Sequence, residues 1–167
     1  MNFANRISQT LHDEHCATVA LMERFEQLLA QRRRSGPPDT ADGMVAKLLN
    51  DLSLGVAAEV ERHFAFEENQ LFPYLVAAGD GAIGANLTSE HDTMRPLGLR
   101  VSELAREATM RGFDNARWDE FRRLGQELCQ RMLMHVQKEE MALLPLLDES
   151  MDQETEARLY QSYVANV

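Results

Sequence analysis

Two stretches of this chain are near-copies of each other: residues 63–75 read HFAFEENQLFPYL and residues 135–147 read HVQKEEMALLPLL. They share His, two adjacent Glu, Leu, Pro and Leu at an offset of 72 positions, from 63 to 135. In each copy a histidine and a glutamate stand four residues apart, which places them one turn apart on the same face of a helix. The repeat therefore predicts two equivalent helices, each presenting a His-x-x-x-Glu pair to one side.

The sequence around these copies predicts four long helices separated by three breaks. The breaks are residues 34–39 (RSGPPD), residues 79–81 (GDG) and residues 112–114 (GFD), where Asp114 is placed to cap the last long helix. Apolar residues recur at every third or fourth position between the breaks, which is the period of an α-helix. Because short loops make successive helices antiparallel, we expect an all-α fold, an up-down-up-down four-helix bundle. A short additional helix is expected near residues 154–163.

Length and charge limit the class of protein. A chain of 167 residues suits one domain, and we expect a single domain over residues 1–167 with its bundle core at about residues 6–148. The net charge of −10 makes nucleic acid and anionic membranes poor partners. The chain has no long apolar run, its first fifteen residues are polar and its two cysteines form no motif, so a cytoplasmic location is expected.

Polar residues interrupt the apolar stripe of every helix. His15 and His91 interrupt the first and third stripes, each directly after a glutamate, and the two copies of the repeat interrupt the other two. Counted from the breaks between them, the four histidines lie at roughly one level in antiparallel helices of equal rise, although His63 is 17 residues before Asp80 and His91 only 11 residues after it. The residues predicted to converge in this layer are His15, His63, Glu67, His91, His135 and Glu139.

The composition of this layer favours a metal centre. A single core histidine is more often a structural residue than a ligand, but two buried carboxylates are costly unless they are paired. No Lys or Arg lies on the stripes at that level to pair with them. If both glutamates bridge two ions, each ion receives two nitrogens and two oxygens, and an oxo or hydroxo bridge adds another ligand. Mixed imidazole and carboxylate donors suit iron, with zinc or manganese as substitutes.

Residues close to the predicted layer are expected to have lesser roles. His12 is off the apolar stripe and is expected at the surface, Cys16 is expected to pack as a small residue, and Arg95 is expected to be solvated. Glu68 and Glu140 follow the predicted ligands and point about 100° away from them, so solvated or outer-sphere roles are expected for both. These five residues are therefore not predicted to bind the metal directly.

At these residues the sequence resembles the hemerythrin-like family, also called the HHE cation-binding domain. The resemblance extends from about Arg6 to Leu147, and its carriers are Glu14-His15, the repeat copies at 63–75 and 135–147, and Glu90-His91. It implies a non-haem di-iron centre with bridging carboxylates that binds or reacts with dioxygen, peroxide or nitric oxide.

The chain departs from the oxygen-carrying hemerythrins at two positions. Those proteins have a second histidine four residues after the third-helix ligand, where this chain has Arg95, and they place the last acid where this chain has Glu140. We therefore expect oxidation of both irons rather than reversible oxygen carriage. An iron- or redox-sensing interaction module, whose metal controls stability and binding to an unidentified protein partner, remains an alternative, as does a structural zinc site.

Overall fold

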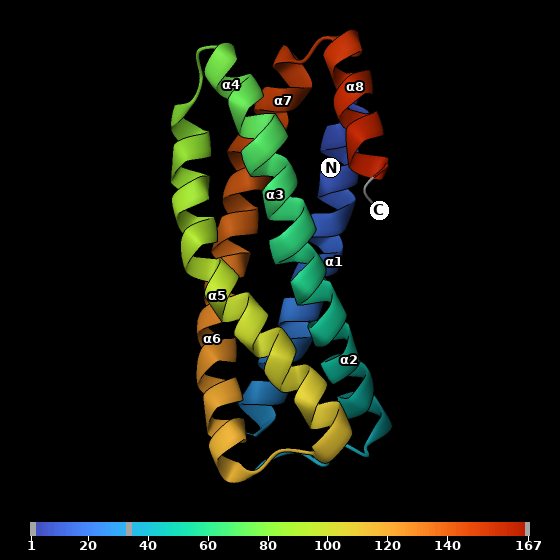
Figure 1. The fold of residues 1–167 in the computed structure, drawn as a ribbon, viewed down its shortest axis with the longest axis vertical. Coiled ribbons are helices and arrows are strands. Elements are labelled where there is room, and N and C mark those ends of the chain that lie inside the picture. The colour runs from blue at the N-terminus through green and yellow to red at the C-terminus, as the bar shows by residue number, and fades with distance from the viewer. Residues whose placement is uncertain (1–2, 33–34, 166–167) are drawn as a thin grey trace.

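The computed structural model describes residues 3–32 and 35–165, and every regular element in these ranges is a helix (Figure 1). Segments labelled α are α-helical, and those labelled η are π-helical. In chain order they are α1 (Arg6–Gln31), α2 (Gly43–Ala58), η1 (Glu59–His63), α3 (Phe64–Phe66), η2 (Glu67–Leu71), α4 (Phe72–Ala77), α5 (Ala82–Arg111), α6 (Asn115–Lys138), η3 (Glu139–Leu143), α7 (Leu144–Ser150) and α8 (Gln153–Val164).

The predicted breaks coincide with the ends of the long helices. The breaks at 79–81 and 112–114 separate α4 from α5 and α5 from α6, and the expected tail helix is α8. Arg34, the first residue of the break at 34–39, lies outside the described residues, and the rest of that break lies between α1 and α2. The predicted cap is confirmed, because the Asp114 carboxylate accepts a hydrogen bond from the Arg117 backbone N–H. Gly112 ends α5 with a φ of 72°, a conformation that glycine adopts at little cost.

Both copies of the repeat change from α-helical to π-helical hydrogen bonding at the same point. The segments η2 and η3 each begin at a glutamate and end two residues before a proline, which is Pro73 or Pro145. Proline has no N–H, and its ring displaces the carbonyl of the residue four positions earlier, so the preceding turn widens. The rods at residues 43–77 and 115–150 therefore continue through their prolines, and each inner glutamate of the repeat opens a widened turn.

The long helices pack side by side as a helical bundle. Helix α1 packs against α2 and α6, and α5 packs against the same two helices (Figure 1). Figure 1 places α4, α7 and α8 together at one end of the bundle. Among the described residues, no helix combines the length and apolar character needed to cross a bilayer.

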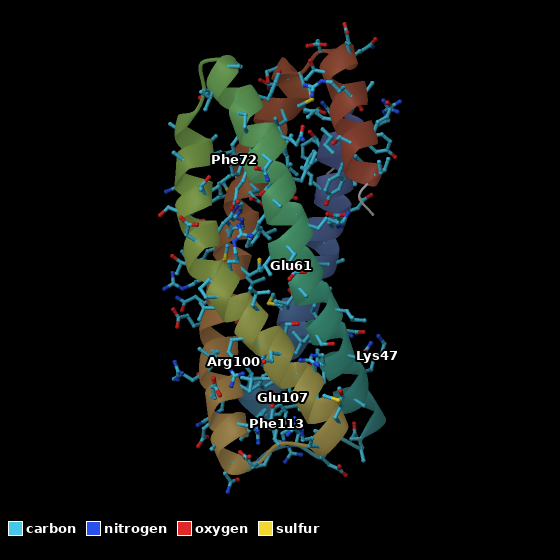
Figure 2. All side chains as sticks on the ribbon, viewed as in Figure 1. Lys47, Glu61, Phe72, Arg100, Glu107 and Phe113 are labelled. Carbon is cyan, nitrogen blue, oxygen red and sulfur yellow. The ribbon has the colours of Figure 1, made fainter. Side chains whose placement is uncertain are left out.

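Two apolar clusters fill the bundle, and a polar layer lies between them. Figure 2 shows Phe72 and Phe113 toward opposite ends of the molecule; Phe72 belongs to one cluster and Phe113 packs against the other. Along α1, Leu11 belongs to the first of these clusters and Met22 to the second, while the buried His15 lies between them. The apolar packing therefore encloses the polar layer from both ends of the bundle.

The close approach of α1 and α6 at Gly125 generates a prediction about stability. A Cβ atom added to this buried glycine would overlap the ring of Phe25, which is itself fully buried against Phe121. We expect Gly125→Ala to overpack this contact and lower the free energy of unfolding by about 1–3 kcal/mol, as overpacked cores do. Urea unfolding followed by circular dichroism measures the change.

The matched control is Gly43→Ala at the first residue of α2, where an added Cβ would meet nothing within 4 Å. This variant should be as stable as the wild type or slightly more stable, because alanine has the higher helix propensity. Equal stability of the Gly125→Ala variant and the wild type would contradict the close packing of α1 on α6.

Candidate metal centre

The structure brings all six of the predicted residues together in one buried layer. His15 comes from α1, His91 from α5 and His135 from α6, while the π-helical segments supply the other three. None of the six residues is more than 1% exposed: His15, His63, Glu67, His91, His135 and Glu139. Residues from all the long helical segments of the bundle therefore form the layer, and it is closed to solvent.

The four imidazoles form two pairs. The Nε2 atoms of His15 and His63 are 3.4 Å apart, and those of His91 and His135 are 3.0 Å apart. The ring of Phe64 stacks on His91 with 3.9 Å between centroids and 7° between planes, which fixes the orientation of that imidazole. All four Nε2 atoms consequently face the interior of the layer.

The two carboxylates lie between the imidazole pairs. The Oε2 and Oε1 atoms of Glu139 lie 2.9 Å from Nε2 of His15 and 2.9 Å from Nε2 of His135, which belong to different pairs. The two oxygens of Glu67 lie 3.4 Å and 3.3 Å from the Nε2 atoms of the remaining two histidines. Each carboxylate thus offers one oxygen to each imidazole pair.

The donor atoms of the layer fit a metal centre. The donors of Glu67, His91, His135 and Glu139 lie within 4.8 Å of one another, and Glu139 belongs to a second such group with His15 and His63. Within the described residues, none of the four oxygens of Glu67 and Glu139 accepts a hydrogen bond of acceptable geometry. Buried carboxylate oxygens without hydrogen bonds are costly, whereas cations coordinated by these oxygens would offset the cost. The cluster is therefore compatible with a metal site.

A ring of outer carboxylates holds the four histidines in place. Each imidazole contacts, through Nδ1, a glutamate from a different segment of the chain, so Nδ1 donates and Nε2 can offer its lone pair to the interior. The pairs and their distances are His15–Glu140 (2.6 Å), His63–Glu14 (3.0 Å), His91–Glu68 (2.9 Å) and His135–Glu90 (3.0 Å). The arrangement follows the sequence repeat, because Glu14 and Glu90 precede histidines whereas Glu68 and Glu140 follow the inner glutamates.

The comparison with known protein families agrees with this geometry. Residues 6–147, most of the chain, match the family described as the Hemerythrin HHE cation binding domain. The chain belongs to this hemerythrin family. None of the curated proteins matches the sequence. All six residues of the buried layer, and the four glutamates of the outer ring, lie within the matched region.

Each outer glutamate of this hemerythrin domain has a further partner that carries or can carry positive charge. These partners hold the carboxylates in position and balance their charge. They are Arg62 on Glu14 (2.6 Å), Arg95 on Glu68 (2.7 Å), Lys138 on Glu90 and His12 on Glu140 (2.8 Å). In the described structure, this further partner is a permanent cation for three of the outer glutamates, and for Glu140 it is a second histidine.

Three expectations about neighbouring residues are wrong. His12 is not a free surface residue, because its Nδ1 binds Glu140 and its side chain is only 16% exposed. Arg95 is not simply solvated, because it binds Glu68 and also donates to the Val60 backbone carbonyl at 2.6 Å. Cys16 is exposed instead of packed. Contacts between helices decide the positions of His12 and Arg95, and the period of a single helix does not report them.

The roles of two kinds of polar residue at the hemerythrin site were not predicted from the sequence. The roles of Glu14 and Glu90 are signalled only by their repeated position before a histidine. Glu59 is buried, with its Oε2 accepting a hydrogen bond of 3.0 Å from the Thr18 hydroxyl. The sequence indicates the role of Glu59 only by its position four residues before His63, which puts both side chains on one face of the helix.

The metal-free layer holds protons strongly. Burial by itself lowers the pKa of His15, but the facing carboxylates of Glu139 and Glu140 outweigh it and raise the pKa to about 9. Burial likewise opposes the rise in the pKa of His135, which reaches about 9 through the charge of the facing Glu139. Burial raises the pKa of Glu139, yet the facing His135 and His15 lower it well below its usual range. A cation entering the layer must therefore displace protons.

These shifts predict that the Tm of the metal-free protein falls as the pH rises, while the increase in Tm on binding metal grows. The folded-state pKa values of His15 and His135 are about 9, against about 6.5 in an unfolded chain. Their contribution to stability is complete below about pH 6.5 and is lost as the pH rises to about 9. We expect the Tm of the metal-free protein to fall by several degrees over this range, in EDTA, followed by circular dichroism.

The increase in Tm on adding Zn²⁺ should grow over the same range, because fewer protons must be displaced at higher pH. A double variant, His15→Gln with His135→Gln, is the control and should flatten the pH dependence of the metal-free Tm. A metal-free Tm that is constant or rises from pH 6.5 to 9 would contradict the protonated layer.

Proposed function

We propose that this hemerythrin domain binds two iron ions and reacts with dioxygen, peroxide or nitric oxide, as one domain folded in an up-down-up-down four-helix bundle. The observation that carries the proposal is the inner carboxylate pair. Glu67 and Glu139 have no hydrogen bond of acceptable geometry among the described residues, and each directs one oxygen to each imidazole pair. A shared site for two cations accounts for both features.

The residues divide between the two ions by imidazole pair. His15 and His63 would hold one ion, and His91 and His135 would hold the other. Glu67 and Glu139 would each give one carboxylate oxygen to one ion and the other oxygen to the second ion. Two nitrogens and two oxygens for each ion suit iron, with manganese or zinc as substitutes. Bound as ferrous ions, the pair would supply the electrons that reduce a small oxidant.

The ligand set favours oxidation at both positions over reversible carriage of oxygen. Arg95 stands where oxygen carriers of the family have an additional histidine, and its guanidinium is engaged by Glu68 and the Val60 carbonyl. Each ion is therefore expected to have two imidazoles, so neither position is filled by the protein alone. Resetting the protein then requires an external reductant.

A small cavity between α1 and α2 favours an uncharged ligand. It has a volume of about 100 Å³ and is lined by Ala17, Thr18, Leu21, Met22, Gly55, Val56, Glu59 and Met132. Thr18 and Glu59 lie one turn from His15 and His63, respectively, so the cavity adjoins the layer on that side. Its apolar wall suits dioxygen, nitric oxide or neutral hydrogen peroxide, and the carboxylate of Glu59 disfavours anions.

Metal analysis tests the ligand set. We expect two ions per chain in protein reconstituted with ferrous iron under anaerobic conditions, measured by elemental analysis. His15→Ala should lose at least one ion because it removes an inner nitrogen. The matched variant His12→Ala should keep both, because His12 contacts Glu140 of the outer ring and is not one of the clustered inner donors. One ion or none in the wild type, or the reverse behaviour of the two variants, would refute the assignment.

Cycles of oxygenation and vacuum deoxygenation test the reaction. We expect the di-ferrous protein to develop the near-ultraviolet absorption of ferric iron in air and to keep it under vacuum until dithionite is added. Zinc-loaded protein is the control and should not change its spectrum. An oxygenated species that returns to the di-ferrous state without added electrons would support reversible carriage instead.

A further inference from the structure

The last helix of the chain contacts the ring of outer glutamates. Helix α8 lies beyond the region that matches the family, and it packs against α1 at the end of the bundle that also contains α7 (Figure 1). Its Tyr163 is 1% exposed, and its hydroxyl donates a hydrogen bond to the Glu14 carboxylate. The ring of Tyr163 packs on Phe66 with 4.4 Å between centroids.

Glu14 joins α8 to the inner layer. Besides Tyr163, this carboxylate accepts hydrogen bonds from Nδ1 of His63 at 3.0 Å and from Arg62 at 2.6 Å. The Arg62 guanidinium also lies over the Tyr163 ring, 4.8 Å from its centroid. Three elements, α1, η1 and α8, therefore meet at one carboxylate that orients an inner histidine.

The equivalent position in the other half of the repeat has no such helix. Glu90 corresponds to Glu14, and its partners are His135 and Lys138, whose side chain is 45% exposed. In the described part of the chain, both hydrogen bonds of Glu90 come from α6, whereas Tyr163 joins Glu14 to the additional helix α8; the two glutamate side chains are equally exposed, at 25%. The two halves thus share their inner donors but differ in what fixes the outer carboxylate.

Helix α8 depends on its contacts with the rest of the fold. It has only 12 residues, a length at which an isolated helix is marginal in water. Its other attachments include Leu159, which is 1% exposed within the apolar cluster of Phe72, and a double ion pair between Arg6 and Glu156, at 2.8 Å and 2.9 Å, with the Arg6 side chain 56% exposed. Exposed ion pairs contribute little, so the buried contacts of Leu159 and Tyr163 are a main part of what holds α8 on the bundle, and only that of Tyr163 reaches the Glu14 carboxylate among the described hydrogen bonds.

We propose that Tyr163 is a positioning residue that couples the docking of α8 to metal binding by His63. With α8 docked, Tyr163 fixes Glu14, and Glu14 holds His63 with Nε2 directed into the layer. Because coupling between two equilibria is reciprocal, a metal ion in the layer must stabilise the docked helix as much as the docked helix stabilises the ion. Loss of metal would then loosen α8 and expose Phe66 beneath it, which would make the occupancy of the site detectable at the surface. This inference rests on metal binding by the inner layer, as proposed above.

The test compares Tyr163→Phe with Tyr160→Phe in the full chain. Both variants remove one hydroxyl from α8, but the recorded ring contact of Tyr160 is with Arg6, 4.7 Å away, and not with the metal layer. Competition between protein and a chelator for Co²⁺ gives the affinity, and the visible Co²⁺ spectrum reports the ligand geometry. We expect Tyr163→Phe to weaken the binding of one of the two ions by about 10-fold, the lower end of the effect of losing a direct partner of a ligating histidine, because Tyr163 acts through Glu14, and to alter the spectrum. Tyr160→Phe should match the wild type.

Hydrogen exchange provides a second measurement, made on the wild type and on Tyr163→Phe. Zn²⁺ should slow exchange of the α8 amides, and it should do so much less in Tyr163→Phe. Equal Co²⁺ affinities for both variants, or α8 exchange that Zn²⁺ does not change in the wild type, would overturn the coupling. If the wild type binds neither Co²⁺ nor Zn²⁺, the proposed metal centre itself is refuted, which is a different result.

Discussion

The structure depends on two carboxylates, Glu67 and Glu139, that are buried between two apolar clusters without hydrogen bonds of acceptable geometry among the described residues. A buried carboxylate is tolerated only where positive charge compensates it. In the metal-free fold, protonated imidazoles would supply that charge: the pKa values of His15 and His135, which face Glu139, are raised, as is that of His63, which faces Glu67. Cations would replace those protons in the proposed loaded state.

The outer ring explains how four imidazoles can be held in such a layer. Each Nδ1 contacts a glutamate, and three of those glutamates are fixed in turn by arginine or lysine. The permanent positive charges therefore lie outside the ring, where the side chains are partly exposed and inexpensive to keep charged. The interior keeps only carboxylates and imidazoles, whose protons a bound cation can replace.

The two halves of the repeat supply the same inner donors but differ in the partners of their outer glutamates. The inner donors follow the sequence repeat, which supports two similar metal positions and a reaction that uses both. The outer contacts break this symmetry, because Tyr163 of α8 binds Glu14 whereas Lys138 of α6 binds Glu90. The contact of α8 with one side of the inner layer is the physical basis for the proposed link between the site and the surface of the protein.

The sequence by itself determined the helices, their breaks and the six residues of the inner layer, because helical period and loop position fix which residues share a face and a level. It could not determine that Glu14 serves His63 and not its neighbour His15, that Arg95 is engaged by Glu68, or that Tyr163 reaches Glu14 from 149 positions away. These contacts depend on how helices are rotated and set against one another. Periodicity within one helix carries no information on that rotation, so only the packed bundle decides them.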